Sequence, residues 1–169
     1  VLPVDVPQLP VEMLEELLEA GFPPQTAVQM MNTALVAGRE ELCFSTVDMC
    51  VFDLYQGTCE LMKAGASTTF IRTGGGVEKI SSTTLPIGVL QELEIQRTCR
   101  QLADGDFVIM VTDGVLDALP VGNQEAMLSA LIGGTSINNP GELAHYLLEQ
   151  VLEMSGEVPA DDMTVLAVG

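Results

Sequence analysis

The chain has 169 residues, the length of one domain, and 47% of them are hydrophobic, as is normal for a chain that folds around a packed core. Its 24 Asp and Glu residues against six Lys and Arg residues give a formal net charge of −18, which repels nucleic-acid backbones and anionic membrane surfaces. No run of the sequence approaches the roughly 20 apolar residues that span a bilayer. We therefore expect neither nucleic acid nor a membrane among the partners of this segment.

The negative charge is unevenly distributed along the chain. Arg100 is the last basic residue, whereas residues 101–169 contain eleven acids and no Lys or Arg. That part of the chain must either tolerate its own repulsion or recruit cations.

The four cysteines indicate the cellular compartment of the protein and whether it binds zinc. They lie among apolar residues with a strand-like pattern, no two of them form a C-x-x-C pair, and the only histidine, His145, falls in a separate helical stretch. We therefore expect no zinc site, and we expect buried, reduced thiols of a cytoplasmic protein or of the cytoplasmic part of a membrane-anchored parent. The four are Cys43, Cys50, Cys59 and Cys99.

The hydrophobic pattern predicts an extended, proline-rich lead-in over residues 1–10 and a single domain over residues 11–169. Apolar residues at helical spacing, with glycine behind each run, predict a helical hairpin at the start of the domain. β-branched and aromatic runs between turn residues then predict a series of strands. The start of the last helix is marked by Asn139 as the N-cap residue and Pro140 as the first helical residue. Glu142 follows in the first turn. In chain order the predicted elements are helices at 11–20 and 24–37, strands within 42–55 and at 59–63, 68–72, 77–80, 92–100 and 107–112, helices at 125–132 and 140–154, and a strand at 163–168.

Strands that follow one another through tight turns pair antiparallel, so we expect those at 59–63, 68–72 and 77–80 to form a meander. The strand within 42–55 carries apolar residues on both faces, which predicts that it is covered on each side. With helices at both ends of the chain covering the sheet, the expected fold class is α+β.

Two acidic segments are the strongest candidates for chemistry. Asp113 follows an apolar strand and precedes Gly114, and Asp161 and Asp162 precede the last strand. If these two strands are neighbours, Asp113 and Asp161 converge at one end of the sheet, where no Lys or Arg is near in sequence to balance them. A hard divalent cation such as Mg²⁺ or Mn²⁺ suits such oxygen ligands. The alternative is that Asp-Gly is a common turn dipeptide and that the acidic pair is a solvated cap.

Two further acids have two interpretations each. Asp48, inside a strand, either lies next to the metal ligands and supports them or is a hydrogen-bonded structural acid. Asp117, four residues after Asp113, either faces a cation from a short helix or is solvated.

Five segments follow one another along the chain: FSTVDMCVFDLY, AGASTTFI, TLPIGVL, DGDFVIMVTDGVLDA and ADDMTVLAV. In order and spacing they resemble the metal-dependent serine/threonine phosphatases of the PPM or type 2C superfamily, especially the bacterial branch typified by the stage II sporulation protein E phosphatase. The resemblance runs from about Leu14 to the end of the chain.

The resemblance implies an antiparallel β-sandwich flanked by helices, with two Mn²⁺ or Mg²⁺ ions held at one end. Asp113 matches the aspartate of the family's S/T-D-G motif, and Asp161 matches the first aspartate of its D-D/N-x-T motif. The resemblance therefore implies that both residues are metal ligands and catalytic residues. The metals would activate a water that attacks the phosphorus of a phosphoserine, without a covalent enzyme intermediate. The residues expected to surround and orient these ligands are Gly114, Asp162, Thr112, Thr164 and Asp48.

The resemblance also implies a substrate. In bacterial relatives the usual substrate is a phosphoserine on a small anti-anti-sigma protein. Its dephosphorylation leads to release of a sigma factor in sporulation or stress signalling.

One motif of the family has no counterpart here. Its first metal loop, similar to D-G-M-G-x-G, should precede the helix at 11–20, where prolines stand instead. We therefore expect an N-terminally truncated domain that lacks the first strands and holds half of a binuclear site, and whose open strand edges favour a homodimer. The alternative function is a catalytically incomplete, phosphatase-like fragment that binds a partner or dimerises.

Overall fold

The computed structural model describes residues 8–38, 44–156 and 161–169, and the chain divides into two compact units. The first unit comprises Val1–Phe52, Cys59–Ala66 and Ser82–Arg100. The second unit comprises Asp53–Thr58, Ser67–Ser81 and Gln101–Gly169. Each unit is described by itself.

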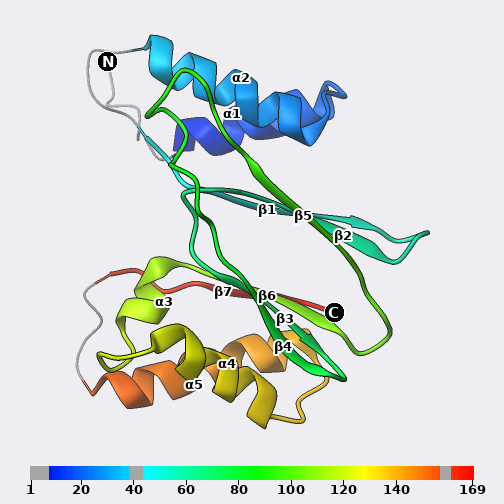
Figure 1. Cartoon of the computed structure of the whole chain (residues 1–169), viewed down its shortest axis with the longest axis vertical. Coiled ribbons are helices and arrows are strands. Elements are labelled where there is room, and N and C mark those ends of the chain that lie inside the picture. Colours follow the sequence, from blue (N-terminus) through cyan, green and yellow to red (C-terminus); the bar gives the residue numbers. More distant parts are fainter. Residues whose placement is uncertain (1–7, 39–43, 157–160) are drawn as a thin grey trace. The chain divides into compact units, whose positions relative to one another are not determined.

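The first unit pairs a helical hairpin with a three-stranded sheet (Figure 1). The hairpin is α1 (Gln8–Glu19) and α2 (Pro24–Ala37), and α2 has the predicted bounds because proline stands in its first turn and Gly38 follows its last residue. Helix α1 begins three residues earlier than predicted, and residues 1–7 of the expected lead-in lie outside the described residues. The strands are β1 (Val47–Asp53), β2 (Thr58–Ala64) and β5 (Gln96–Gln101), in the order β1-β2-β5.

A small core joins the helical hairpin of the first unit to strand β2 and to Ile87, which precedes β5 in the chain. Val28 and Met31 of α2 are buried together with Ala64 of β2 and Ile87. Ile87 is held in place by backbone hydrogen bonds with Ser45, of 2.9 and 3.0 Å. The LPIG segment is therefore packed against the helical hairpin.

Strand β1 is not covered on both faces, contrary to the prediction. Its residues are half-buried, and Val51 is exposed. A continuous apolar run marks a strand without showing how much of each face other elements cover. The predicted start of this strand at residues 42 and 43 lies outside the described residues.

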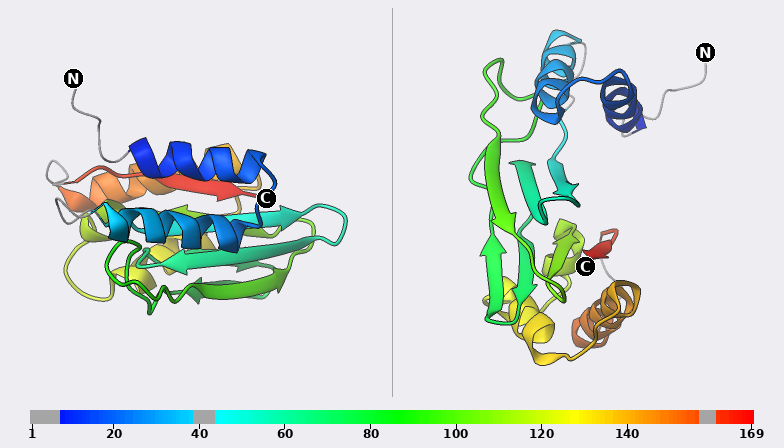
Figure 2. Two further views of the ribbon diagram at one scale, coloured as in Figure 1. Left: turned by 90° about the horizontal axis from the view of Figure 1, so that it is seen from above. Right: turned by 90° about the vertical axis from the view of Figure 1, so that its right-hand side faces the viewer.

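The second unit is a four-stranded antiparallel sheet covered by helices. Figures 1 and 2 show α4 (Gln124–Gly134) and α5 (Pro140–Ser155) on the same side of this sheet. Their buried Leu and Ile residues pack with Phe70, Phe107 and Ile109 in one apolar core. The strands are β3 (Thr69–Thr73), β4 (Gly76–Ile80), β6 (Phe107–Val111) and β7 (Val165–Val168), in the order β4-β3-β6-β7.

The N-cap predicted for the last helix is confirmed. The Asn139 side chain accepts a hydrogen bond of 3.0 Å from the Glu142 backbone N–H, and Pro140 is the first residue of α5. The α+β fold class, with antiparallel sheets and flanking helices, is also confirmed.

The predicted meander is wrong in one place. Strands β3 and β4 form the expected hairpin, but β2 belongs to a different sheet from β3. The chain turns between them at Gly65, which has a φ of +62° and against which Pro86 packs closely. Only glycine adopts this conformation readily, and the short connection at Gly65 leads from one sheet into the other.

Candidate functional site

The strands that carry the two candidate acidic segments are adjacent. Strand β6 pairs antiparallel with β7, with Val111 opposite Val165, and the Thr112 backbone N–H donates a 3.1 Å hydrogen bond to the Thr164 carbonyl. Because the strands run in opposite directions, the end of β6 lies beside the beginning of β7. Asp113 follows the first of these ends and Asp161 and Asp162 precede the second, so the predicted adjacency of the two strands is confirmed.

Thr112 holds the two segments together through its side chain. Its hydroxyl oxygen accepts a 2.9 Å hydrogen bond from the Thr164 backbone N–H, and the hydroxyl donates a 3.3 Å bond to the Asp162 carbonyl. Thr112, the residue before Asp113, is therefore bonded to the residues on both sides of Met163.

Gly114 permits a close approach of the same two segments. It is buried, and a Cβ atom there would lie 3.1 Å from the Asp162 carbonyl carbon and closer still to the carbonyl oxygen. A side chain cannot be placed there unless the backbone moves, so glycine is required by the packing of the turn against residues 161 and 162.

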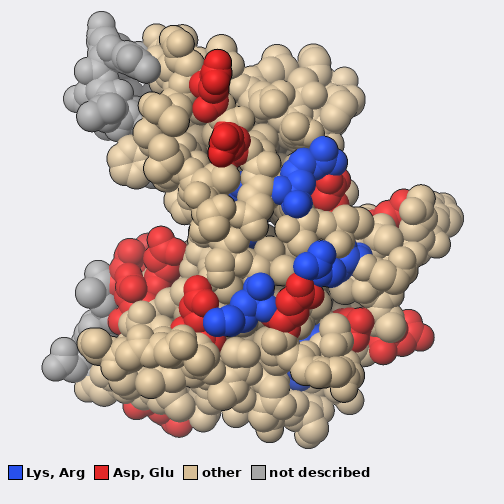
Figure 3. Space-filling view, viewed as in Figure 1, with Lys and Arg blue, Asp and Glu red and all other residues tan. Residues whose placement is uncertain are grey.

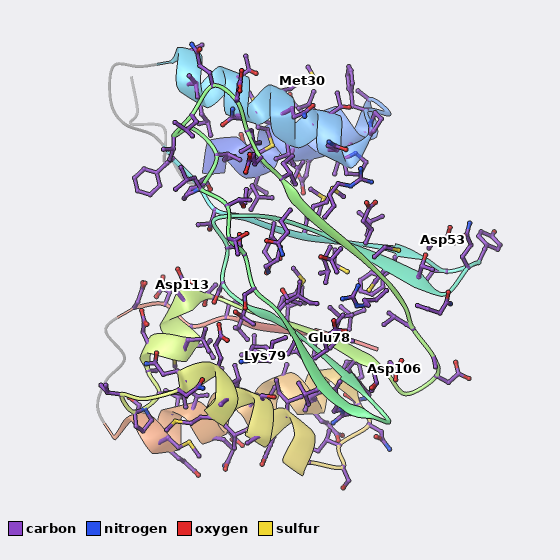
Figure 4. All side chains as sticks on the ribbon, in the orientation of Figure 1. Met30, Asp53, Glu78, Lys79, Asp106 and Asp113 are labelled. Atoms are coloured by element: carbon purple, nitrogen blue, oxygen red, sulfur yellow. The ribbon has the colours of Figure 1, made fainter. Side chains whose placement is uncertain are left out.

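The carboxylates of the two segments are accessible. Asp113, Asp161 and Asp162 are all exposed, and Oδ1 of Asp161 accepts a 2.8 Å hydrogen bond from the Asp162 backbone N–H. Figure 4 labels Asp113 at the start of α3 (Asp113–Asp117), and Figure 3 shows acidic side chains gathered over the position of that helix. The site therefore presents negative charge to solvent.

Asp113 and Asp117 line an open cleft of about 710 Å³. The sequence interpretation left open whether Asp117 was solvated or shared a site, and the structure places it on the same cleft as Asp113. The sequence analysis considered a short helix here only as one interpretation of Asp117, because five residues are too few for a recognisable periodicity. The other residues that line the cleft are Leu116, Gly122, Asn123, Gln124 and Glu125.

Glu125 on the cleft is held by two residues of the sheet segment. The Thr68 hydroxyl donates a 2.6 Å hydrogen bond to Glu125 Oε1, and the Lys79 ammonium lies 3.1 Å from Oε2. The bond from Thr68, and then the bond and charge of Lys79, lower the pKa of Glu125 below its usual value. The sequence analysis placed Glu125 at the start of the predicted helix at 125–132 but did not include it in the site, because its contacts with Thr68 and Lys79 join residues distant in sequence.

The oxygen ligands of the site suit a hard divalent cation. Mg²⁺ is commonly bound by one or two carboxylates together with several waters, and Asp113 and Asp161 would supply such a pair. Across residues 8–38, 44–156 and 161–169, no group of three or more His, Cys, Asp or Glu side chains is arranged to hold a metal ion.

Asp48 lies in the first unit and has a structural partner. Its Oδ2 is 2.7 Å from the Lys63 ammonium, whose side chain is only 1% exposed. Burial lowers the pKa of Lys63, while the adjacent carboxylate opposes that shift. Removing Asp48 would leave a buried charge without compensation, which supports the structural interpretation of this acid.

The described cysteines are free, but not all of them are buried. Cys59 is buried and Cys50 half-buried, and burial raises the pKa of Cys50 to about 12. Cys99 is exposed, contrary to the prediction, because β5 alternates and residue 99 lies on its exposed side. Cys43 lies outside the described residues.

The remaining sequence candidates add no chemistry to the site. His145 is exposed on α5, and its Nε2 is 3.1 Å from Glu149 one turn later.

Among the helices that the structure describes, none combines the length and apolar character needed to cross a bilayer.

Two solved structures show which class of protein has this fold. The PP2C phosphatase domain with a fragment of the regulatory domain of the cell fate determinant SpoIIE from Bacillus subtilis matches with a TM-score of 0.86 at 30% identity, over 95% of this chain and 48% of that chain. The catalytic domain of the serine/threonine protein phosphatase PstP, in complex with two manganese ions, shares the fold with a TM-score of 0.69 at 22% identity, over 96% of this chain and 79% of that chain. The class is that of the PP2C-type serine/threonine phosphatases.

Sequence comparisons identify the family within this class. The model of stage II sporulation protein E (SpoIIE) matches residues 9–169, so the chain belongs to the SpoIIE family. It is 31% identical over 159 residues to stage II sporulation protein E of Bacillus subtilis (strain 168), which covers 94% of this chain and 19% of that protein. It is also 31% identical over 156 residues to the Priestia megaterium protein, over 92% of this chain and 27% of that protein. The chain thus spans about a quarter or less of these relatives, and the resemblance stated from the sequence is confirmed.

Proposed function

We propose that this chain is the catalytic part of a metal-dependent protein phosphatase that hydrolyses phosphoserine, with Asp113 and Asp161 as ligands of Mn²⁺ or Mg²⁺. The observation that carries the proposal is the adjacency of β6 and β7, which brings the two acidic segments to the same end of the sheet. In the intact family site two such ions are expected, and this chain would contribute the ligands of one part of it.

The residues of this chain would act mainly by positioning. A divalent cation would supply the positive charge that activates a water molecule and neutralises the phosphoryl oxygens. The Asp162 N–H fixes one oxygen of Asp161, and Thr112, Thr164 and Gly114 hold the segments of Asp113 and Asp161 together. Since water would be the nucleophile, no covalent intermediate on a side chain is needed.

The proposed substrate is a phosphorylated anti-anti-sigma-type protein, whose dephosphorylation would lead to sigma-factor release in sporulation or stress signalling. Membership of the SpoIIE family supports this choice. A Mycobacterium tuberculosis structure of RsbU and RsbW domains has the same fold, with a TM-score of 0.81 at 20% identity. The free thiols of Cys50, Cys59 and Cys99 support a reducing compartment, which we propose to be the cytoplasm.

We also propose that the protein forms a homodimer. Strands β1 and β7 stand at the ends of their sheets in the described strand order, and an edge strand offers unpaired backbone groups to a second chain.

The test of the catalytic proposal combines metal binding with turnover. Mn²⁺ should raise the melting temperature of the chain, because a ligand that binds the folded state stabilises it. Asp113→Ala in the full-length protein should abolish both the shift and the hydrolysis of p-nitrophenyl phosphate. Asp104→Ala is the matched control, because Asp104 is an exposed acid of the same unit in the turn before β6, at the opposite end of that strand from Asp113, and it should retain both. Turnover that persists in Asp113→Ala excludes the assignment.

A second function is supported by one observation. The absence of a metal-holding group of three residues from the described part of the chain favours a catalytically incomplete fragment that binds a partner or dimerises. In that case Mn²⁺ would leave the melting temperature unchanged and no phosphate ester would be hydrolysed. A concentration-dependent mass in analytical ultracentrifugation would then show self-association.

A further inference from the structure

Two segments of the second unit line the cleft that contains Asp113. One is α3, and the other is the run of residues 122–125, which leads into the first turn of α4. Asp113, the proposed metal ligand, belongs to the α3 side. The start of α4 therefore forms a second wall of the cleft, made of residues that have no proposed role in metal binding.

Glu125 attaches this second wall to the sheet at the end where Asp113 lies. Its Oε1 accepts a 2.6 Å hydrogen bond from the hydroxyl of Thr68, the residue before β3, and its Oε2 lies 3.1 Å from the ammonium of Lys79 on β4. Strand β3 pairs antiparallel with β6, so the beginning of β3 lies beside the end of β6 that leads into Asp113. The contacts of Glu125 thus join the wall to the strands next to the metal ligand.

Thr68 is the stronger of the two anchors. It is 4% exposed, whereas the Lys79 side chain is 38% exposed. An ionised carboxylate only accepts hydrogen bonds, so the Thr68 hydroxyl gives its single hydrogen to Glu125 and accepts the 3.0 Å bond from the Ser81 hydroxyl. A buried hydrogen bond to a charged group contributes more than an exposed ion pair. We therefore expect Thr68, more than Lys79, to fix the position of Glu125.

The same contacts make Glu125 a poor metal ligand. Both of its carboxylate oxygens are engaged by protein groups, and the adjacent ammonium disfavours a second cation at this position. Asp113 and Asp161 would hold the metal ion, whose charge compensates theirs. An effect of Glu125 on the reaction would therefore come from the position of the wall and not from coordination of the metal.

We infer that Glu125 is a positioning residue that, through its bond with Thr68, holds the start of α4 as the wall on which the phosphoserine segment of the protein substrate binds. The inference rests on the proposed function, since it assumes that phosphoserine is hydrolysed at a cation held by Asp113. Because the wall is already held in one position, the substrate does not have to order it on binding. The anchor therefore lowers KM without changing the chemical step.

The test measures hydrolysis of a synthetic phosphoserine peptide by the full-length protein with Mn²⁺. Glu125→Ala should raise KM about tenfold and change kcat by less than about twofold, as expected when a hydrogen bond to a charged group no longer holds a binding surface. The Mn²⁺ concentration that gives half-maximal hydrolysis of p-nitrophenyl phosphate should stay the same. Glu142→Ala is the matched control, because Glu142 is an exposed acid in the first turn of α5, and it should keep the wild-type KM.

Two further variants test whether the effect passes through Thr68. Thr68→Val keeps the size of the side chain and removes the hydroxyl, so it should raise KM by the same factor as Glu125→Ala. The double variant should raise KM no further, because each single variant removes the same bond. Glu125→Gln should restore most of the wild-type KM, since its amide oxygen still accepts a hydrogen bond from Thr68.

The outcomes separate the inference from the proposed function. An unchanged KM in Glu125→Ala, additive effects in the double variant or no rescue by Glu125→Gln overturns the inference and leaves the phosphatase assignment intact. A higher Mn²⁺ requirement in Glu125→Ala also overturns it, because Glu125 would then be a metal ligand. If the wild-type protein hydrolyses neither the peptide nor p-nitrophenyl phosphate, the proposed function fails. The peptide's dissociation constants, measured by fluorescence anisotropy in wild-type, Glu125→Ala and Thr68→Val protein, then decide the inference by the same ratio.

Discussion

Gly114 determines how closely the residues after β6 approach those before β7. Its Cα faces the Asp162 backbone at a distance that leaves no space for a side chain. The residue is in a helix and has no positive φ, so the requirement for glycine comes from packing and not from backbone conformation. The pattern Asp-Gly in the sequence predicted a turn, and it is the tertiary contact that explains the glycine.

Gly114→Ala should destabilise the protein and displace Asp161. The new methyl group meets a backbone carbonyl, which cannot move aside as a flexible side chain can, so we expect a loss of about 1–3 kcal/mol of unfolding free energy. Urea denaturation followed by circular dichroism measures it. Gly134→Ala at the end of α4 is the matched control, because a Cβ there meets no atom within 4 Å, and it should be neutral or stabilising. Equal stability of the two variants would contradict the packing argument.

At the scale of elements, Asn32 joins α2 to the segment that contains Ile87 and Gly88. Its amide donates to the carbonyls of Leu90 at 2.9 Å and Gln91 at 3.3 Å, and its oxygen accepts a 2.7 Å bond from the Gly88 N–H. Asn32 is buried, so these groups have no access to water as an alternative partner. One polar side chain thus fixes a loop that has no regular secondary structure.

Asn32→Ala should loosen this loop more than it perturbs the helix. Removing the amide leaves the half-buried Gly88 N–H and the carbonyls of Leu90 and Gln91 without this partner, at a cost of about 1–3 kcal/mol in unfolding free energy. Hydrogen exchange measured by mass spectrometry should show faster exchange at residues 87–91. Gln29→Ala, an exposed position on the same helix, should leave exchange there unchanged. Slow exchange at 87–91 in the Asn32 variant would show that Ile87 packing alone holds the loop.

At the scale of the whole molecule, charge is the dominant feature. The net charge of −18 is combined with only six basic residues, several of which are engaged by acids, such as Lys63 with Asp48, Lys79 with Glu125 and Arg97 with Glu60. The remaining acids repel one another, and this repulsion opposes the compact state.

Added salt should therefore stabilise the protein. Raising NaCl from about 20 to about 300 mM shortens the range of charge interactions to less than about 10 Å, so the repulsion is screened and the melting temperature should rise by several degrees. Exposed ion pairs weaken at the same time, but each contributes little. Differential scanning fluorimetry measures the change. The double variant Asp104→Asn and Glu153→Gln should show a smaller rise, and a melting temperature that falls with salt would contradict this account.

Local sequence determined the helices and most strands of this protein. The bounds of α2 and the cap of α5 follow from proline, glycine and asparagine at particular positions, because helix ends depend on neighbours within one turn. The positions of Asp113 and Asp161 near the ends of β6 and β7 also follow from the sequence, since an acid that closely follows or precedes an apolar strand lies near a sheet's end.

Only the tertiary structure decided which strands are neighbours and which residues share the cleft. The separation of β2 from β3, the Thr112 link to Asp162 and Thr164, and the Lys63 partner of Asp48 all join residues distant in sequence. Local patterns do not determine such contacts, because their free energy comes from burial and hydrogen bonding between elements that have already come together.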